Sequence, residues 1–486
     1  MSPTTQISRR RIAVLGGGIS GLTAAYVLAR ARQAGAPIEE FLIEAKDRLG
    51  GVIQTENVDG FVIEAGPDSF LTEKPEAAAL CRELGIGDSL LGSNDSERRT
   101  YILHHGKLTP LPDGLMLLVP TRLWPMVNTP LLPLRSKVAM ASEWMMPPSN
   151  SHDDESVADF VRRHFGSAML DNIADPLLAG VYGGDSALLS ARSVLNRFWK
   201  MEKKHGSLTR AVLQARRQRK ADAKKGGADK PRVAPPLFTT LKHGLGQMTE
   251  TLIKNLEGTR LHTGQRVVTI DIEATGSGPR YQIRCDGNVS YAADAIVMAM
   301  PAHACSRLLT GIDPALAESL GAVPYNSAMT VALAYDEETA KLLPPGFGFL
   351  VPRKESRRLL ACTFVQGKFA HRAPQGKALL RCFLGGSRDQ EVLKLSDQEI
   401  VALVRHDLAS ILKLKIEPLF HRVHRWPASM AQYHVGHEEA VARITARMEN
   451  HPGLALAGNA FSGIGISDCV RTGRAAGERV VQYLRR

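Results

Sequence analysis

Ile12-Ala13-Val14-Leu15-Gly16-Gly17-Gly18-Ile19-Ser20-Gly21 joins a short apolar run to a glycine-rich turn with GxGxxG spacing. The pattern predicts a buried strand over 12–15 and a helix over 22–31. Gly16 suits a tight turn, Gly18 lets phosphates approach the backbone, and Gly21 lets the helix pack close to the strand. The N-terminus of that helix then offers free N–H groups and a partial positive charge to a dinucleotide pyrophosphate.

An acidic residue follows at the distance that a ribose contact requires. A second apolar run over 41–43 ends at Glu44, which lies 23 residues after Gly21. A carboxylate there accepts hydrogen bonds from ribose hydroxyls. The next segment places Arg48 beside Gly50-Gly51, which by itself fits either a solvated turn or a phosphate or flavin contact. Arg-x-Gly-Gly after the ribose acid resembles the amine-oxidase-like flavoproteins, so we expect FAD rather than NAD.

The composition is that of an ordinary globular protein. The chain has 486 residues, 44% hydrophobic and 23% charged, which predicts two or three domains. Its six cysteines form no CxxC spacing and His104-His105 stand apart, so we expect free thiols in a reducing compartment and no metal site. Arg9-Arg10-Arg11 precede the cofactor strand without a cleavage site, which argues against an export signal. Uncharged apolar runs stay shorter than the about 18 residues that a membrane-spanning helix needs.

A basic tract carries half of the net charge of +12. Residues 216–232 contain eight Lys or Arg residues and two Asp residues, with Gly226-Gly227 and Pro231 among them. This composition predicts a basic mobile loop over 216–236. The loop is either a solvated insertion or a segment attracted to an anionic membrane surface. We do not expect nucleic-acid binding, because no aromatic residues are interleaved with the charges.

Proline-punctuated apolar runs follow one another between residues 115 and 146. They cover 115–120, 123–127, 130–134 and 144–146. One interpretation is a set of short buried helices. The other is an apolar surface that enters one membrane leaflet, with Trp124, Trp144, Arg122 and Arg135 at the interface.

The sequence predicts a discontinuous cofactor domain. Strand-like runs occur at 265–270 and 280–285, the run at 294–301 is expected to return to the nucleotide sheet, and 454–459 adds another strand. We therefore predict an α/β fold with a discontinuous Rossmann-like FAD-binding domain, a mixed α+β substrate domain and a helical, membrane-associating domain. The predicted boundaries are 8–88, 240–302 and 446–486 for the FAD-binding domain, 89–108 and 303–445 for the substrate domain, and 109–215 for the helical domain.

Over nearly its whole length the chain resembles the FAD- and oxygen-dependent protoporphyrinogen oxidase family, which includes related coproporphyrinogen III oxidases. Motifs shared with the wider superfamily are 16–21, 44–51, 66–70, 241–248, Val267 and 458–468. The segments 175–185, 346–352, 372–374 and 383–388 are more specific, and they separate this family from monoamine oxidases and carotenoid desaturases.

The resemblance implies which residues hold the cofactor and which the substrate. FAD is expected to contact Gly16, Gly17, Gly18, Ile19, Ser20, Gly21, Glu44, Ala45, Arg48, Gly51, Gly66, Pro67, Asp68, Ser69, Val267, Gly458, Ile464, Gly465 and Ile466. The tetrapyrrole is expected beside Gly180, Leu350, Thr363 and Phe383, with a ring stacked on Phe383. Relatives often carry leucine at the position of Thr363. At the position of Thr100 many relatives carry an arginine, which pairs with a propionate of the substrate. The neighbouring Arg99 is a candidate to replace that arginine.

The implied reaction belongs to haem biosynthesis. It is a six-electron oxidation of protoporphyrinogen IX to protoporphyrin IX by dioxygen, with release of hydrogen peroxide. The alternatives are coproporphyrinogen III as the substrate, another flavin amine or polyene oxidase, or a non-catalytic surface-binding protein. The cofactor carries the chemistry, and no side chain is identified as catalytic. The resemblance also implies a homodimer, a cytoplasmic location peripheral on the inner face of the cell membrane, and hand-over of product to a ferrochelatase.

Overall fold

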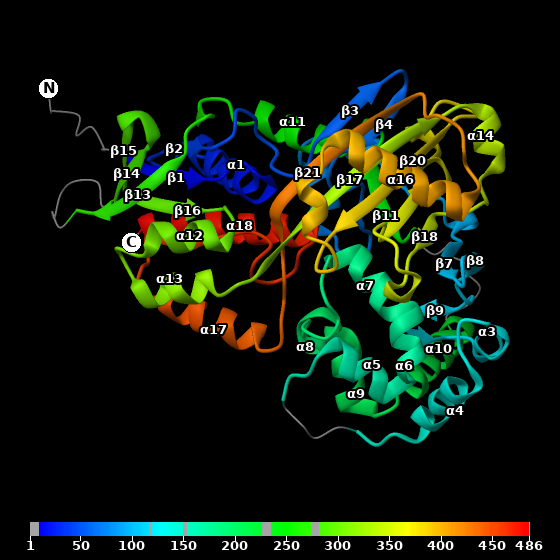
Figure 1. Ribbon diagram of the computed structural model, residues 1–486. Helices are drawn as coiled ribbons and strands as arrows, with labels where there is room; N and C mark the ends of the chain where they lie inside the picture. The colour runs from blue at the N-terminus through cyan, green and yellow to red at the C-terminus, as the bar shows by residue number, and fades with distance from the viewer. Residues whose placement is uncertain (1–8, 117, 149–152, 226–234, 274–280, 486) are drawn as a thin grey trace, which may run out of the picture.

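A five-stranded parallel sheet forms the centre of the predicted cofactor domain (Figure 1). The computed structural model describes residues 9–116, 118–148, 153–225, 235–273 and 281–485. The strand order is β12 (Arg260–His262), β2 (Ile38–Ile43), β1 (Arg10–Leu15), β16 (Ala295–Met298) and β22 (Leu454–Leu456). The sheet therefore draws strands from both ends and the middle of the chain, within the three segments that the sequence assigned to one domain.

Side-chain alternation along β1 explains how the sheet is covered on both faces. Ile12 and Val14 pack on helices α1 (Ile19–Gln33), α2 (Glu76–Glu83), α11 (Gly246–Lys254) and α18 (Ile466–Leu484). Ala13 and Leu15 face a second layer. That layer contains β13 (Val267–Ile272), β14 (Tyr281–Cys285), β15 (Ser290–Ala293), α12 (Ala302–Leu309), α13 (Pro314–Gly321) and α17 (His437–Met448).

A seven-stranded mixed sheet forms the centre of the predicted substrate domain. Its order is β21 (Phe420–Ala431), β17 (Tyr325–Tyr335), β20 (Ala378–Gly385), β19 (Ala361–Phe364), β18 (Gly348–Leu350), β7 (Thr100–His104) and β8 (Lys107–Pro110). Helix α16 (Asp397–Leu412) covers one face, where Val331, Phe349 and Cys382 are buried. The opposite face packs in part on β4 (Phe61–Glu64), and Ile102 and Leu350 on that face pack against the helical part of the chain.

Smaller elements connect these two sheets. The hairpin of β3 (Thr55–Val58) and β4 leads into the 66–69 loop. A three-stranded sheet contains β5 (Phe70–Leu71), β11 (Phe238–Leu241) and β6 (Leu90–Gly92). Helices α14 (Glu337–Leu342) and α15 (Val365–Lys368) join strands of the larger sheet.

The segment between β8 and β11 is mainly helical in its described residues and has its own apolar core (Figure 1). It contains β9 (Leu115–Met116), β10 (Val119–Pro120), α3 (Leu123–Asn128), α4 (Leu134–Ser142), α5 (Val157–Phe165), α6 (Ser167–Met169), α7 (Asp175–Tyr182), α8 (Ala191–Val194), α9 (Asn196–His205) and α10 (Leu208–Lys225). Phe160, Leu178 and Leu208 are among its buried residues. The described helices of the whole chain include none that is both long and apolar enough to span a membrane.

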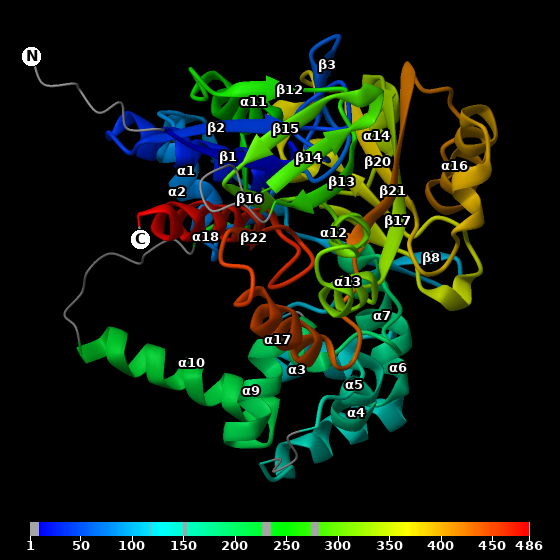
Figure 2. The same cartoon turned by 90° about the vertical axis from the view of Figure 1, so that its left-hand side faces the viewer.

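Helix α10 corrects one expectation from the sequence. Residues 216–225, predicted as the start of a mobile loop, continue this helix, and Figure 2 shows α10 extending away from its neighbours. Alanine, arginine, lysine and glutamine are good helix formers, so a basic composition does not exclude a helix. Residues 226–234 of the tract lie outside the described residues.

The proline-punctuated runs are divided between core and surface. Leu118, Val119, Met126, Leu131 and Leu132 are buried. In contrast, Trp124, Val127, Leu134, Val138 and Met145 are 52–77% exposed. This part of the chain therefore buries some of its apolar side chains and exposes others. The interpretation of the exposed ones as a membrane-entering surface stays a prediction.

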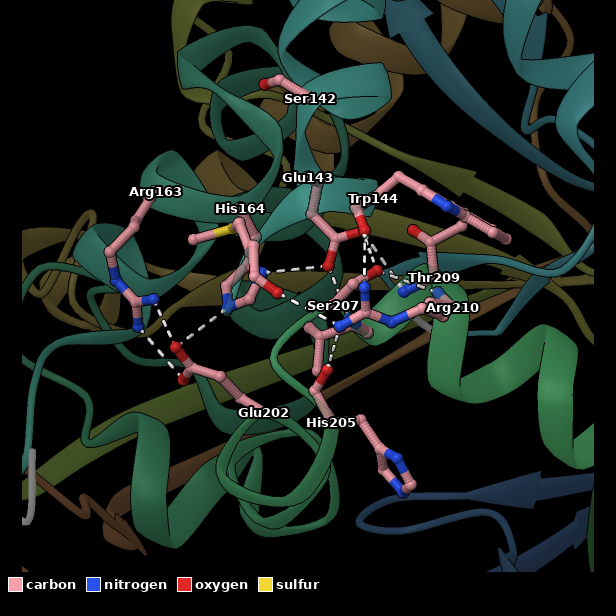
Figure 3. A network of polar contacts seen from close by, with 12 residues as sticks. Ser142, Glu143, Trp144, Arg163, His164, Glu202, His205, Ser207, Thr209 and Arg210 are labelled. Atoms are coloured by element: carbon pink, nitrogen blue, oxygen red, sulfur yellow. Dashed lines mark hydrogen bonds and ion pairs between the residues drawn. The ribbon is translucent and has the colours of Figure 1, made fainter. Parts of the chain in front are cut away.

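A buried polar network ties α5 and α9 to the start of α10 (Figure 3). His164 lies between Glu143 (Nδ1 to Oε1, 3.3 Å) and Glu202 (Nε2 to Oε1, 3.6 Å). Glu143 also accepts hydrogen bonds from Ser207 Oγ at 2.9 Å and from two backbone N–H groups of α10. Burial alone would lower the pKa of His164, but its hydrogen bonds to the two glutamates raise it. Arg163 completes the network by pairing with Glu202.

Candidate functional site

The GxGxxG turn lies at the carboxyl end of β1, where α1 begins. Gly16 has a φ angle of +104°, a conformation that L side chains rarely adopt. A Cβ atom on Gly21 would lie 1.8 Å from the Gly16 carbonyl oxygen. Only glycine at position 21 therefore lets α1 pack this closely against the turn.

Gly18 differs because the space beside it is open. A Cβ atom there would meet, among the described heavy atoms within 4 Å, only the Cα of Gly51 at 3.9 Å. Its φ of −73° is open to any residue, so neither strain nor packing requires glycine. Helix α1 has no acidic residue in its first turn, and none of the described side chains caps it. This cradle fits a phosphate that lies close to the backbone and receives the N–H groups of α1.

Glu44 follows β2 and lies directly against the turn. Its Oε2 accepts a hydrogen bond from Gly17 N–H at 2.6 Å, and its Oε1 accepts one from Lys46 N–H at 2.8 Å. A carboxylate has about four acceptor positions, so about two remain for the hydroxyls of a ribose. Gln265 N–H donates to the Glu44 carbonyl at 3.0 Å, which places the start of β13 at Val267 beside this carboxylate.

A second glycine turn packs against the first. Gly50 N–H donates to the Gly17 carbonyl at 2.8 Å. Arg48 donates through Nη2 to the Gly51 carbonyl at 2.7 Å, and its guanidinium lies 6.0 Å from the ring centre of Trp426. Arg48 therefore holds the shape of this turn through the backbone. Trp426 was not anticipated from the sequence, because its position on β21 is distant from every glycine motif.

The C-terminal segment brings a second helix N-terminus to the same edge of the parallel sheet. β22 is followed by Gly458, with a φ of +130°, and α18 begins at Ile466. A Cβ atom on Gly473 would lie 2.3 Å from a backbone oxygen of α1, so this glycine allows the two helices to touch. Asp468 accepts a hydrogen bond from Gly465 N–H at 3.2 Å and thereby caps α18. The uncapped α1 is therefore the better anion site.

A buried cluster of charged side chains lies beside the 66–69 loop. Lys368 Nζ is 3.0 Å from Asp68 Oδ1, and Arg372 Nη2 is 2.9 Å from Glu64 Oε1. Arg381 Nη1 is 3.8 Å from Asp68 Oδ2. Burial opposes the charge on Asp68, but Lys368 and Arg381 outweigh it and hold the pKa of Asp68 well below its usual range. Burial raises the pKa of Glu64 and lowers the pKa of Lys368 and Arg381.

Sequence reasoning missed this cluster as a unit. Asp68 and Lys368 are 300 positions apart, and no local pattern links them. A usable signal was Arg381, a charged residue inside the apolar run of β20. Arg381 is 95% buried, which an arginine tolerates only with partners.

The register of the larger sheet brings the predicted substrate residues together. β19 pairs with β18 and β20 so that Leu350, Thr363 and Phe383 project from one face. All three side chains are partly exposed, whereas Phe349 on the opposite face is buried. Gly180 of α7 lies against the same face, because a Cβ atom there would be 3.4 Å from Leu350 Cδ2.

Thr100 shares this face, but Arg99 does not. β7 pairs Thr100 with Gly348 of β18, directly beside the substrate residues. Arg99 is exposed, and its side chain lies against Tyr101, which belongs to the core on the α16 side of the sheet. The structure therefore does not bring Arg99 to the other predicted substrate residues.

Known proteins share this architecture. A family model described as flavin containing amine oxidoreductase matches residues 19–481. Coproporphyrinogen III oxidase of Bacillus subtilis (strain 168) is 34% identical over 98% of this chain and 99% of the relative. Protoporphyrinogen oxidase 1, chloroplastic, of Arabidopsis thaliana is 31% identical over 94% of this chain and 85% of the relative.

Solved structures agree with this assignment. A crystal structure from Exiguobacterium sp. 255-15, provisionally named protoporphyrinogen oxidase, has a TM-score of 0.84 and 28% identity, covering 97% of this chain and 99% of that chain. A putrescine oxidase variant with 18% identity and a TM-score of 0.67 shows the same fold over 98% of this chain and 99% of that chain. This chain belongs to the family of flavin containing amine oxidoreductases.

Proposed function

We propose that this protein is an FAD-dependent oxidase that converts protoporphyrinogen IX to protoporphyrin IX, with dioxygen as the final electron acceptor. The observation that carries the proposal is the gathering of Gly180, Leu350, Thr363 and Phe383 on one partly exposed face. An apolar face with few polar groups suits a large, flat macrocycle. The names of the curated relatives support this substrate class.

FAD fits the residues of the glycine turn. The N-terminus of α1 and the open space at Gly18 would hold the pyrophosphate, and Glu44 would hold a ribose. Bound FAD supplies the hydride acceptor for a meso carbon of the substrate. The larger sheet contacts the expected flavin loop directly, because Arg381 on β20 donates to the carbonyl of Gly66 in that loop.

The protein's own contribution is positioning and exclusion of water. Phe383 offers a ring for stacking, and Leu350 excludes water from one side of the substrate. Asp68 is a hydrogen-bond acceptor rather than a base near neutral pH, because its lowered pKa keeps it ionised and weakly basic.

Coproporphyrinogen III is the second candidate substrate. The relatives from Bacillus subtilis and Staphylococcus aureus, 34% and 31% identical, both carry the name coproporphyrinogen III oxidase. A turnover assay with both porphyrinogens, followed by porphyrin fluorescence and oxygen consumption, distinguishes the two substrates. Protein-free samples correct for spontaneous oxidation. Flavin-loaded protein that is inert on both substrates contradicts the proposal.

We further propose that the helical part binds a membrane surface peripherally. The support is the group of exposed apolar side chains on α3, α4 and the turn that follows α4. The homodimer, the cytoplasmic location and the hand-over of product to a ferrochelatase stay predictions.

A further inference from the structure

The buried cluster beside the 66–69 loop contains more cations than anions. Among the described residues, it joins Glu64 and Asp68 to Lys368, Arg372 and Arg381. Their side chains are 0–15% exposed. At least one positive charge is therefore left without a carboxylate, even when both acids are ionised. A buried unpaired charge is costly, so an anion that enters the cluster is stabilised.

Arg381 is the cation with the weakest pairing. Lys368 donates to both oxygens of Asp68 at 3.0 and 3.1 Å, and Arg372 lies 2.9 Å from Glu64. Arg381 approaches a carboxylate only at the longer distance of 3.8 Å to Asp68, and its Nη2 donates to the carbonyl of Gly66. Its buried Nε atom has no hydrogen-bond partner within the described part of the chain. Arg372 Nε is also unpartnered there, but Arg372 already faces its own carboxylate.

The position of Arg381 places this charge on the substrate face. Arg381 pairs directly with Thr363 across β19 and β20, two residues from Phe383 on the same strand. Its guanidinium carbon is 4.8 Å from the centre of the Phe383 ring. The guanidinium lies over one face of the Phe383 ring, so a macrocycle would stack on the other face, and a flexible propionate would reach past the ring edge to the guanidinium. The planar fork of arginine matches a carboxylate, and both candidate porphyrinogens carry propionate groups at their periphery.

We propose that Arg381 is a specificity-determining residue that binds a propionate carboxylate of the substrate. The assignment rests on the proposed function and adds the residue that recognises the anionic edge of the macrocycle. The competing use of the same charge is stabilisation of negative charge on a reduced flavin, since the 66–69 loop is also the expected flavin contact.

The experiment compares protoporphyrinogen IX with its dimethyl ester on flavin-loaded protein in detergent. Wild-type protein is expected to prefer the free acid by about ten-fold in kcat/KM, the value of one charge-assisted hydrogen bond. Arg381→Gln is expected to lose this preference, so that its kcat/KM values for the acid and the ester agree within about two-fold. Arg381→Lys keeps the charge without the fork and is expected to fall between them. Arg405→Gln, on α16 at the other face, is the matched control and retains the preference.

Each contrary result has a distinct meaning. Equal losses of acid and ester turnover in Arg381→Gln, with a lowered flavin reduction potential, assign Arg381 to the cofactor and overturn the proposal. If the Arg381 variants do not fold, wild-type protein decides, because equal turnover of acid and ester overturns the assignment without any variant. Wild-type protein that is inert on both substrates overturns the proposed function and this assignment together.

Discussion

Gly18 and Gly21 lie three residues apart in one turn, yet the structure gives each a different reason to be glycine. At Gly21 the neighbouring backbone leaves no room for a side chain, so the residue serves the fold. At Gly18 the protein leaves room and the backbone is relaxed, so neither packing nor strain requires glycine there, which is consistent with the pyrophosphate site that we propose. Stability and cofactor affinity should therefore respond separately to these two positions.

We expect Gly18→Ala to fold normally but to bind flavin poorly. The new methyl group meets no described protein atom closer than 3.9 Å, so the free energy of unfolding of the apoprotein should change by less than about 1 kcal/mol. The same methyl group occupies the space that we propose for the pyrophosphate, so flavin affinity should fall by about ten-fold or more. Thermal unfolding of apoprotein and a flavin fluorescence titration measure the two effects.

Two further glycine substitutions serve as controls. Gly21→Ala should destabilise the apoprotein itself, because its Cβ would lie 1.8 Å from a carbonyl oxygen. Gly311→Ala should change neither property, since no described atom lies within 4 Å of its added Cβ. Undiminished flavin affinity in Gly18→Ala would contradict the assignment of the pyrophosphate to this turn.

At the scale of elements, α5, α9 and α10 meet at one ionisable side chain. His164 is fully buried between Glu143 and Glu202, and Glu143 also binds backbone N–H groups at the start of α10. A protonated His164 balances the carboxylates, whereas a neutral one leaves them in excess. The packing of these helices is therefore coupled to pH.

We expect His164 to stabilise the fold more at pH 6 than at pH 9. Its pKa is raised in the folded protein, so its contribution is fully present below the unfolded pKa of about 6.5 and is lost as pH rises through the folded pKa. The difference in unfolding free energy between wild type and His164→Gln should shrink by on the order of 1 kcal/mol between these pH values. Urea denaturation at both pH values measures it.

The exposed His421 on β21 provides the control for this measurement. His421→Gln should leave the pH dependence of wild-type protein unchanged. A His164→Gln effect that is equal at pH 6 and pH 9 contradicts the assignment of a protonated histidine.

At acid pH, Glu202 of the same network has the opposite pH dependence. Burial opposes the charge of Glu202, but hydrogen bonds from His164 and Arg163 lower its pKa to about 2. Its contribution to stability is present above the unfolded pKa and is lost only as pH falls toward about 2.

The sequence predicted local structure better than contacts between distant segments. The strand–turn–helix unit at 12–31 depends on neighbouring residues, so its apolar run and glycines located β1 and α1. The face shared by Arg381 and Thr363 depends on strand register, which hydrogen bonds between separate strands decide. The prediction of a loop at the start of the basic tract was wrong, because residues 216–225 are helical. A high density of charge predicts exposure to solvent but does not decide between helix and coil.

At the scale of the whole molecule, exposed apolar side chains gather on one group of helices. Trp124, Leu134 and Met145 are 74–77% exposed, and they lie on α3, on α4 and in the turn after α4. Arg122, which precedes α3, and Arg135, in the first turn of α4, are exposed as well. Apolar side chains with nearby positive charge are what an interfacial protein offers to an anionic lipid surface.

We expect Trp124→Ser combined with Leu134→Ser to weaken membrane binding. Each exposed side chain that enters the apolar boundary contributes about 2 kcal/mol, so the loss of both should lower the partition constant by up to about a thousand-fold. Sedimentation with vesicles of phosphatidylcholine and anionic phosphatidylglycerol measures the bound fraction. Turnover of detergent-solubilised substrate should stay unchanged.

Leu342→Ser combined with Leu419→Ser is the matched control, because these residues are 59% and 53% exposed on the seven-stranded part. This pair should bind vesicles as wild type does. Wild-type protein that stays in the supernatant with phosphatidylcholine vesicles, and also with vesicles that contain phosphatidylglycerol, contradicts the proposal that the helical part binds a membrane.

The discontinuous parallel sheet also imposes an order on biosynthesis. β1 and the glycine turn are translated before the other strands of their sheet, but the sheet is completed by β22, and α1 is covered by α18, which follows β22. The nascent chain must therefore hold an unfinished nucleotide site while every intervening segment is translated. We therefore expect flavin to bind only after α18 has been translated, and a chain that ends before α18 would leave the side of α1 that packs on α18 uncovered.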